Sequence, residues 1–137
     1  MKQTLIAVVA LSVISAAAIA GEFPPLQRVP VLEEAIPSTN PPVKLVRGAR
    51  IRFAPSQPTG LHRHPISVAG VVTAGSFIFK REGEPEKVIK TGEPFFEAAG
   101  VTTERFDNAS NTEPAELVAF FLADTKDRAL IEMLGPK

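Results

Sequence analysis

The sequence contains no cysteine, no tryptophan and no tyrosine. Without cysteine the chain forms no disulfide bonds, so its core must be held together by the burial of apolar side chains alone. The absence of tryptophan argues against a carbohydrate site built on stacked indole rings. Histidine is also scarce, because His62 and His64 are the only two in 137 residues.

The chain has no excess of charge of either sign. It carries 15 lysines and arginines against 15 aspartates and glutamates, which gives a formal net charge of zero. Proteins that bind nucleic acid need a basic patch, so we expect no nucleic-acid partner. The sequence also has no Ser-His-Asp arrangement, no phosphate-binding loop and no basic amphipathic helix. The composition therefore identifies no catalytic residue, and the question of whether the protein is an enzyme stays open.

One long hydrophobic run lies at the N-terminus. Lys2 precedes residues 5–20, which are apolar apart from two serines, and Ala18-Ile19-Ala20 before Gly21 matches a signal-peptidase site. The run is short for a membrane span of about 20 residues. We therefore expect residues 1–20 to be a signal peptide. The mature protein would be periplasmic or extracellular, and secreted without a membrane anchor after cleavage.

Prolines concentrate directly after this segment. Six of the 13 prolines lie in residues 21–42, which excludes long helices there. We interpret residues 21–42 as a proline-rich N-terminal arm, in which residues 28–32 would form a short edge strand. Residues 43–137 would then form a single folded domain.

Beyond the arm, short apolar stretches alternate with turns rich in glycine and proline. In residues 43–53 one parity is apolar at Val43, Leu45, Ala49, Ile51 and Phe53, which is typical of a half-buried strand. Further strands are expected at 61–64, 67–73, 76–80, 86–90, 94–97, 101–107 and 115–123, and a helical turn within 124–137. Many short strands without a long helix predict an all-β sandwich or barrel.

The two histidines are candidate ligands. His62 and His64 are two residues apart in the strand expected at 61–64, which places both rings on one face. Two neighbouring imidazoles can share one cation through their ring nitrogens. Arg47 lies on the apolar parity of its own strand. It marks either a bulge or rim position, or a cation that points into a ligand cavity.

The order of motifs around the histidines resembles a small single-domain cupin of the type-2 conserved barrel family. The residues that carry the resemblance are His62-x-His64-Pro65, Gly75, Gly92, Gly100 and Asn108. The family motifs are Gly-x5-His-x-His-x(3–4)-Glu-x6-Gly and Gly-x5-Pro-x-Gly-x2-His-x3-Asn. The resemblance runs from about residue 28 to about residue 123. It implies an RmlC-like jelly-roll β-barrel.

Residue by residue, the resemblance implies that His62 and His64 are metal ligands. The family's glutamate falls on Val68 and the histidine of its second motif falls on Thr103, so two of the four ligand positions are retained. Fe, Mn, Cu, Ni or Zn are the divalent metals that such a site would hold. Without a metal, Val68 and Thr103 would instead help to form a mostly apolar pocket.

A carboxylate is needed to complete the two-histidine, one-carboxylate pattern of non-haem iron sites. The candidates are Glu97 and Glu104. Glu97 points to the ligand face only if Phe95, two residues earlier, faces inward. Glu104 is next to Thr103, so simple alternation turns it away from the ligand face.

We therefore expect a small molecule to bind in the barrel cavity around His62 and His64, with Val68, Thr103 and Arg47 as further contacts. Whether a metal takes part stays open. One alternative is a metal-dependent oxidoreductase of the small dioxygenase type. Another is a non-catalytic module that dimerises, because the resemblance implies a homodimer paired through an N-terminal strand and a sheet edge.

Overall fold

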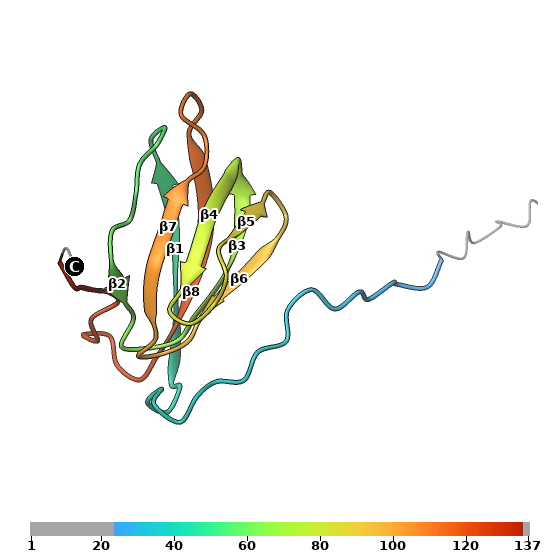
Figure 1. Ribbon diagram of the computed structural model, residues 1–137. Coiled ribbons are helices and arrows are strands. Elements are labelled where there is room, and N and C mark those ends of the chain that lie inside the picture. Colours follow the sequence, from blue (N-terminus) through green and yellow to red (C-terminus); the bar gives the residue numbers. More distant parts are fainter. Residues whose placement is uncertain (1–23, 136–137) are drawn as a thin grey trace, which may run out of the picture.

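The computed structural model describes residues 24–135, and the signal peptide expected at 1–20 lies outside them (Figure 1). Nine strands form in the described residues, and no helix. The strands are β1 Leu45–Phe53, β2 His62–Arg63, β3 Val68–Ala74, β4 Ser76–Arg81, β5 Lys87–Lys90, β6 Pro94–Glu97, β7 Thr102–Asn108, β8 Ala115–Ala123 and β9 Glu132–Met133. Accordingly, this part of the chain offers no apolar helix long enough to cross a membrane.

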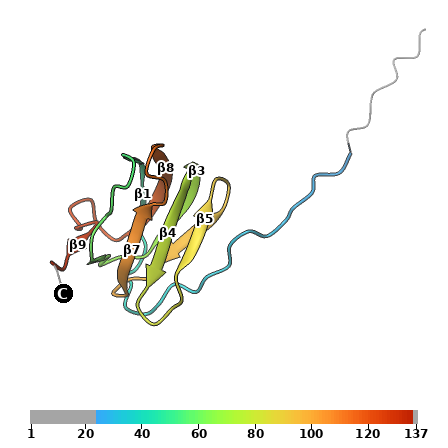
Figure 2. The ribbon, with the colours of Figure 1, turned by 45° about the horizontal axis from the view of Figure 1, so that its top comes forward.

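The strands form two antiparallel sheets that pack face to face (Figures 1 and 2). The strand order is β1-β8-β3-β6 in one sheet and β5-β4-β7-β2-β9 in the other. Consecutive strands of the chain repeatedly change sheets, as in a jelly roll. The all-β, jelly-roll architecture expected from the sequence is thus confirmed.

Strand β1 has the alternation that the sequence predicts. Leu45, Ala49 and Ile51 point inward and are half-buried, and Phe53 at the end of the strand is buried. The strand pairs with β8 over its full length, from Leu45 opposite Ala123 to Phe53 opposite Ala115. A register shift of one residue would expose these apolar side chains to water, so the pattern fixes the register.

Phenylalanine rings fill much of the space between the sheets. The ring of Phe77 packs edge-to-face against Phe53, with centroids 5.0 Å apart, and against Phe106 at 5.3 Å. Phe106 in turn contacts Phe79 and Phe95, each with a centroid separation of 4.9 Å. Such pairs contribute about 0.5–1.5 kcal/mol each beyond the area they bury. Three rings of this cluster, those of Phe53, Phe95 and Phe106, line the cavity described below.

Strand β3 comes very close to the side chain of Phe95 at Gly70. A Cβ atom built on Gly70 would lie 2.2 Å from Phe95 Cζ and 2.5 Å from the carbonyl oxygen of Val118. No side chain fits there. The absence of a side chain at Gly70 lets the buried ring of Phe95 approach the backbone of β3 closely.

Two sequence-based expectations are wrong. Residues 28–32 form no strand, and residues 24–36 run exposed and away from the sandwich (Figure 1). An isolated segment has no sheet edge to pair with, and its prolines lack the N–H groups a ladder needs. The C-terminal residues form no helical turn either, because Glu132 and Met133 instead pair as β9 with β2.

Candidate metal centre and cavity

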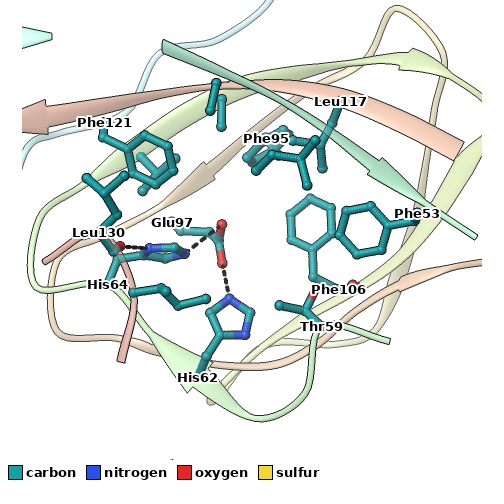
Figure 3. Close-up of a pocket in the computed structure, with 15 residues that line it drawn as sticks. Phe53, Thr59, His62, His64, Phe95, Glu97, Phe106, Leu117, Phe121 and Leu130 are labelled. Atoms are coloured by element: carbon teal, nitrogen blue, oxygen red, sulfur yellow. Dashed lines mark hydrogen bonds and ion pairs between the residues drawn. The ribbon is translucent and has the colours of Figure 1, made fainter. Parts of the chain in front are cut away.

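Both histidines lie inside the sandwich. His62 is in β2, opposite Thr103 of β7 on one side and Met133 of β9 on the other. His62 is 2% exposed and His64 is 5% exposed. Their ring centroids are 5.1 Å apart at an interplanar angle of 84°. The two rings therefore approach each other at right angles at one end of a cavity (Figure 3).

Glu97, the last residue of β6, joins the two rings. Its Oε1 lies 3.3 Å from His62 Nε2, and its Oε2 lies 3.3 Å from His64 Nε2. The three residues offer ligand atoms that all lie within 4.8 Å of one another, and all three are buried. Phe95 faces inward and is 2% exposed, which is the condition under which Glu97 has the right parity.

Val68 and Thr103 lie on either side of this carboxylate. Val68 is directly opposite Glu97 on the β3–β6 ladder and lines the cavity. Thr103 donates a hydrogen bond from its hydroxyl to Glu97 Oε1 at 2.5 Å. Thr103 thus stands at the family's histidine position, but it orients the carboxylate instead of offering a ring nitrogen.

Backbone carbonyl groups fix the orientation of the rings. His62 Nδ1 lies 2.7 Å from the carbonyl oxygen of Gly60, and His64 Nδ1 lies 2.5 Å from that of Leu130. A carbonyl oxygen only accepts hydrogen bonds, so both Nδ1 atoms carry a proton. Both Nε2 atoms consequently face Glu97. Histidines that bind metals show this arrangement, in which the second ring nitrogen donates to a backbone or carboxylate oxygen.

The contact between Glu97 and His64 shifts the pKa of both residues. Burial acts to raise the pKa of Glu97, but hydrogen bonds from His62, His64 and Thr103 outweigh it and lower the pKa from 4.5 to about 2. Burial acts to lower the pKa of His64, but the hydrogen bond and charge of Glu97 outweigh it and raise the pKa above 6.5. Both shifts favour a charged Glu97 carboxylate beside a protonated His64 ring.

The donor set also fits a divalent transition metal. Bonds from such a metal to nitrogen and oxygen are about 2.0–2.2 Å long, which places neighbouring donor atoms about 3.0–3.4 Å apart. The two nitrogen–oxygen separations of 3.3 Å agree with this spacing. Two histidines and one carboxylate are typical of non-haem iron sites, and imidazole also suits Zn, Cu and Ni.

A cavity of about 320 Å³ begins at the three residues and runs between the sheets (Figure 3). Apart from His62, His64 and Glu97, its walls are formed by Ala49, Ile51, Phe53, Thr59, Val68, Phe95, Phe106, Leu117, Ala119, Phe121, Leu130 and Ile131. These side chains are almost all apolar. Four of these lining residues, Ala49, Ile51, Thr59 and Leu130, are half-buried, and Ile131 is 41% exposed.

The other sequence-based candidates lie elsewhere. Arg47 is not among the described residues that line the cavity. Its Nη1 donates to the carbonyl oxygens of Lys126 at 3.0 Å and Arg128 at 3.3 Å, so Arg47 holds the C-terminal segment. Glu104 turns outward as expected and forms an ion pair with Lys80. No sequence pattern points to Gly60 or Leu130, because every residue has a backbone carbonyl oxygen.

Comparison with known proteins gives matches among solved structures. No family model matches the chain, and no curated protein matches it. Oxalate oxidase in complex with glycolate has a TM-score of 0.56 at 24% identity, over 65% of this chain and 46% of the oxidase. A cupin-like protein from Thermotoga maritima has a TM-score of 0.55 at 21% identity, over 66% of this chain and 65% of its own.

Oxalate decarboxylase from Bacillus subtilis has a TM-score of 0.57 at 16% identity, over 65% of this chain and 24% of the decarboxylase. This chain therefore spans about half of the oxidase (46%) and a quarter of the decarboxylase (24%). Likeness at this level of identity concerns the fold.

Proposed function

The chain has the cupin fold, and we propose that it holds a divalent transition metal on His62, His64 and Glu97 and binds a small molecule in the adjacent cavity. The orientation of the two rings carries this proposal. Both Nδ1 protons are taken by backbone carbonyl oxygens, so both Nε2 atoms face the same carboxylate.

This arrangement needs a positive charge at its centre. If both rings were neutral, the lone pair of each Nε2 atom would point at an oxygen of Glu97. The lone pairs and the negatively charged oxygens would repel each other. Either a proton on Nε2 or a metal ion removes the repulsion, so protons and metal compete for the same atoms. A bound metal would act as a Lewis acid toward an oxygen of the ligand. Thr103 keeps the carboxylate in place, and the apolar walls exclude water.

Elemental analysis of protein purified without chelator tests the metal. We expect near-stoichiometric Fe, Mn, Cu, Ni or Zn in the unmodified protein and its loss in His62→Ala and in Glu97→Gln. Glu104→Gln is the matched control, since Glu104 points outward to Lys80 and should keep the metal. The proposal fails if the unmodified protein holds no metal and no divalent ion raises its melting temperature.

A metal-dependent oxidoreductase is the second candidate function. Three protein ligands leave coordination positions open, and the two-histidine, one-carboxylate set is typical of non-haem Fe(II) oxygenases. Because His62, His64 and Glu97 line the cavity, a substrate bound in it would lie next to those positions. Oxygen uptake by the Fe(II)-loaded protein with a panel of small molecules tests this function. Ligand binding without any uptake would support binding alone.

We further propose that the protein is exported, as the hydrophobic segment at residues 5–20 suggests. Intact-mass measurement of the protein recovered from the periplasm or medium should give a chain that begins at Gly21. A recovered chain that still begins at Met1 would contradict export by this signal.

A homodimer is also part of the proposal, and the arm supports it. Leu26, Val29 and Val31 are 80%, 77% and 71% exposed, which is unusual for three neighbouring apolar side chains. Light scattering of the full chain should give a dimer, and lysine substitutions at the three positions should give a monomer. A dimer that survives all three substitutions would exclude the arm. If this dimer forms while the centre binds neither metal nor ligand, the non-catalytic dimerising module is the better description.

A further inference from the structure

We infer the chemical class of the ligand from the walls of the cavity. The cavity fits a molecule with one oxygen-donor head group, neutral or singly negative, on a hydrocarbon body about the size of an aromatic ring. This inference rests on the proposed function, because the head group would lie at the metal and the body among the apolar side chains.

The charges around the cavity limit the charge of the ligand. The described residues that line it include neither lysine nor arginine, and Glu97 is the one carboxylate. Arg47, which shares the inward parity of β1, is already bound to two backbone carbonyl groups. A divalent metal with one carboxylate and two neutral imidazoles has one net positive charge. It balances one negative charge of a ligand.

A second negative charge on the ligand would be buried without a partner. Burial of an unpaired charge is costly, because water no longer solvates it and no cation replaces the water. Dicarboxylates are therefore poor ligands. This separates the chain from oxalate oxidase and oxalate decarboxylase, whose names specify a dicarboxylate and whose fold it shares.

Polar groups on the body of the ligand would also find few partners. Among the described lining residues, Thr59 alone has a hydroxyl group, and its proton is already donated to the carbonyl oxygen of Phe106 at 2.6 Å, so it offers a ligand one acceptor oxygen and no donor. A buried hydroxyl that finds no partner costs about 1–3 kcal/mol. Sugars and other polyols, which carry several hydroxyl groups, are accordingly excluded.

The aromatic walls and the volume set the size of the body. Phe53, Phe95, Phe106 and Phe121 all contribute to the lining. The ring of Phe121 lies 5.9 Å from that of His64, so apolar surface begins next to the metal ligands. A dry cavity of about 150 Å³ already admits benzene. About 320 Å³ therefore accommodates one ring together with a head group.

Calorimetric titration of the Zn(II)-loaded protein with three hydroxamates tests the inference. All three probes share one metal-binding head group. Benzohydroxamate carries a ring, acetohydroxamate has only a methyl group, and 4-carboxybenzohydroxamate adds a second charge to the ring. We expect benzohydroxamate to bind about 10-fold or more tightly than either of the other two, because its ring is buried and uncharged. Equal binding of the charged and uncharged aromatic probes would overturn the inference, and so would equal binding of the two uncharged probes.

Substitutions that fill the cavity locate the ring. Ala119→Leu on β8 should lower the affinity for benzohydroxamate about 10-fold. The affinity for acetohydroxamate and the zinc content should stay unchanged. Ala49→Leu, at a half-buried position of the edge strand β1, is the second variant in case the first disturbs the core. Phe120→Leu is the control, because Phe120 lies on β8 next to Ala119 and is 45% exposed on the outer face. Unchanged affinity for benzohydroxamate in both filled variants would mean that the ring binds elsewhere.

A last measurement separates this inference from the proposed function. Toluene carries a ring without any metal-binding group, and methyl NMR shifts of the metal-free protein report its entry. Shifts at Ile51, Val68 and Leu117 would show that the cavity takes a ring even if no metal binds. Absence of such shifts would contradict the ring-sized body, whatever the metal content.

Discussion

Glu97 is directly opposite Val68 on the β3–β6 ladder, so both side chains point to the same face of the sheet. In the cupin motif that the chain resembles, the glutamate would be residue 68. Here Val68 forms part of the apolar wall, and Glu97 brings a carboxylate to the same two histidines from the neighbouring strand. The carboxylate is therefore retained at the centre, one strand away from its usual place.

An exchange of Val68 and Glu97 should restore the metal binding that the substitution of Glu97 alone removes. Glu97→Val is expected to abolish metal binding, since it deletes the only described carboxylate at the centre. The double variant Val68→Glu/Glu97→Val should regain metal affinity, because directly opposed residues have Cβ atoms about 5 Å apart and a glutamate spans that distance. Competition with a chelating dye measures both affinities. Equal metal affinities in the single and double variants would contradict the expectation that a glutamate at position 68 can replace Glu97 as a ligand.

Thr103 should tune the centre through Glu97. Thr103→Val keeps the shape of the side chain but removes the hydroxyl that donates to Glu97 Oε1. We expect a loss of about 10-fold in metal affinity, as is usual when a residue that orients a ligand is lost. Thr103→Ser keeps the donor and should bind metal nearly as the unmodified protein does. The same dye competition decides, and an equally weak Thr103→Ser variant would assign the effect to packing.

Much of the fold could be predicted from the sequence because the strands are half-buried. The parity of β1, from Leu45 to Phe53, follows directly from its apolar alternation. The C-terminal segment could not be predicted in this way. Its four-residue spacing of apolar side chains imitates a helix, but Glu132 and Met133 take their backbone partners from β2, which is about 70 residues earlier.

The candidate site was predictable to a lesser extent. The spacing of His62 and His64 places both rings on one face, and alternation correctly turns Glu104 outward. The selection of Glu97 depends on how β6 pairs with β3, which is a long-range contact that local pattern does not contain. Arg47 shows the opposite problem, because its inward parity is real but its guanidinium ends on backbone carbonyl groups.

The metal-free protein should be most stable in a mildly acidic range. The pKa of Glu97 is lowered on folding from 4.5 to about 2, so the stability it contributes is present above pH 4.5 and is lost as the pH falls toward 2. The pKa of His64 is raised above 6.5, so its contribution is complete below pH 6.5 and is lost as the pH rises through the folded pKa. Melting temperatures of chelator-treated protein should therefore peak between about pH 4.5 and pH 6.5. This dependence should flatten in Glu97→Gln and persist in Glu104→Gln.

A bound metal should shift the pH of maximal stability upward. A metal can bind Nε2 only after the proton has left, so the rise in melting temperature on addition of Zn(II) should grow as the pH increases from 5 to 8. A constant increment over that range would mean that the metal binds away from the two histidines.

Gly70 should not tolerate even a methyl group. Gly70→Ala would place a Cβ atom 2.2 Å from Phe95 Cζ and 2.5 Å from a backbone oxygen, so the ring or the strand must move. We expect a loss of about 1–3 kcal/mol in the free energy of unfolding, together with weaker benzohydroxamate binding. Gly48→Ala is the control, because its Cβ would meet only the exposed ring of Phe120 at 3.3 Å. Urea unfolding of both variants decides, and equal stabilities would refute the close approach at Gly70.

Arg47 should act on the centre through the C-terminal segment. It binds the carbonyl oxygens of Lys126 and Arg128, and two residues further along, the carbonyl of Leu130 accepts the proton of His64 Nδ1. Arg47→Ala should therefore speed amide exchange in residues 128–134 and lower metal affinity several-fold, because His64 is held less firmly. Arg50→Ala is the matched control, since Arg50 lies on the same strand but is 62% exposed and paired with Glu116. Faster amide exchange with unchanged metal affinity would mean that Arg47 holds the C-terminal segment but does not affect metal binding. Equal exchange in the two variants would show that Arg47 is no anchor.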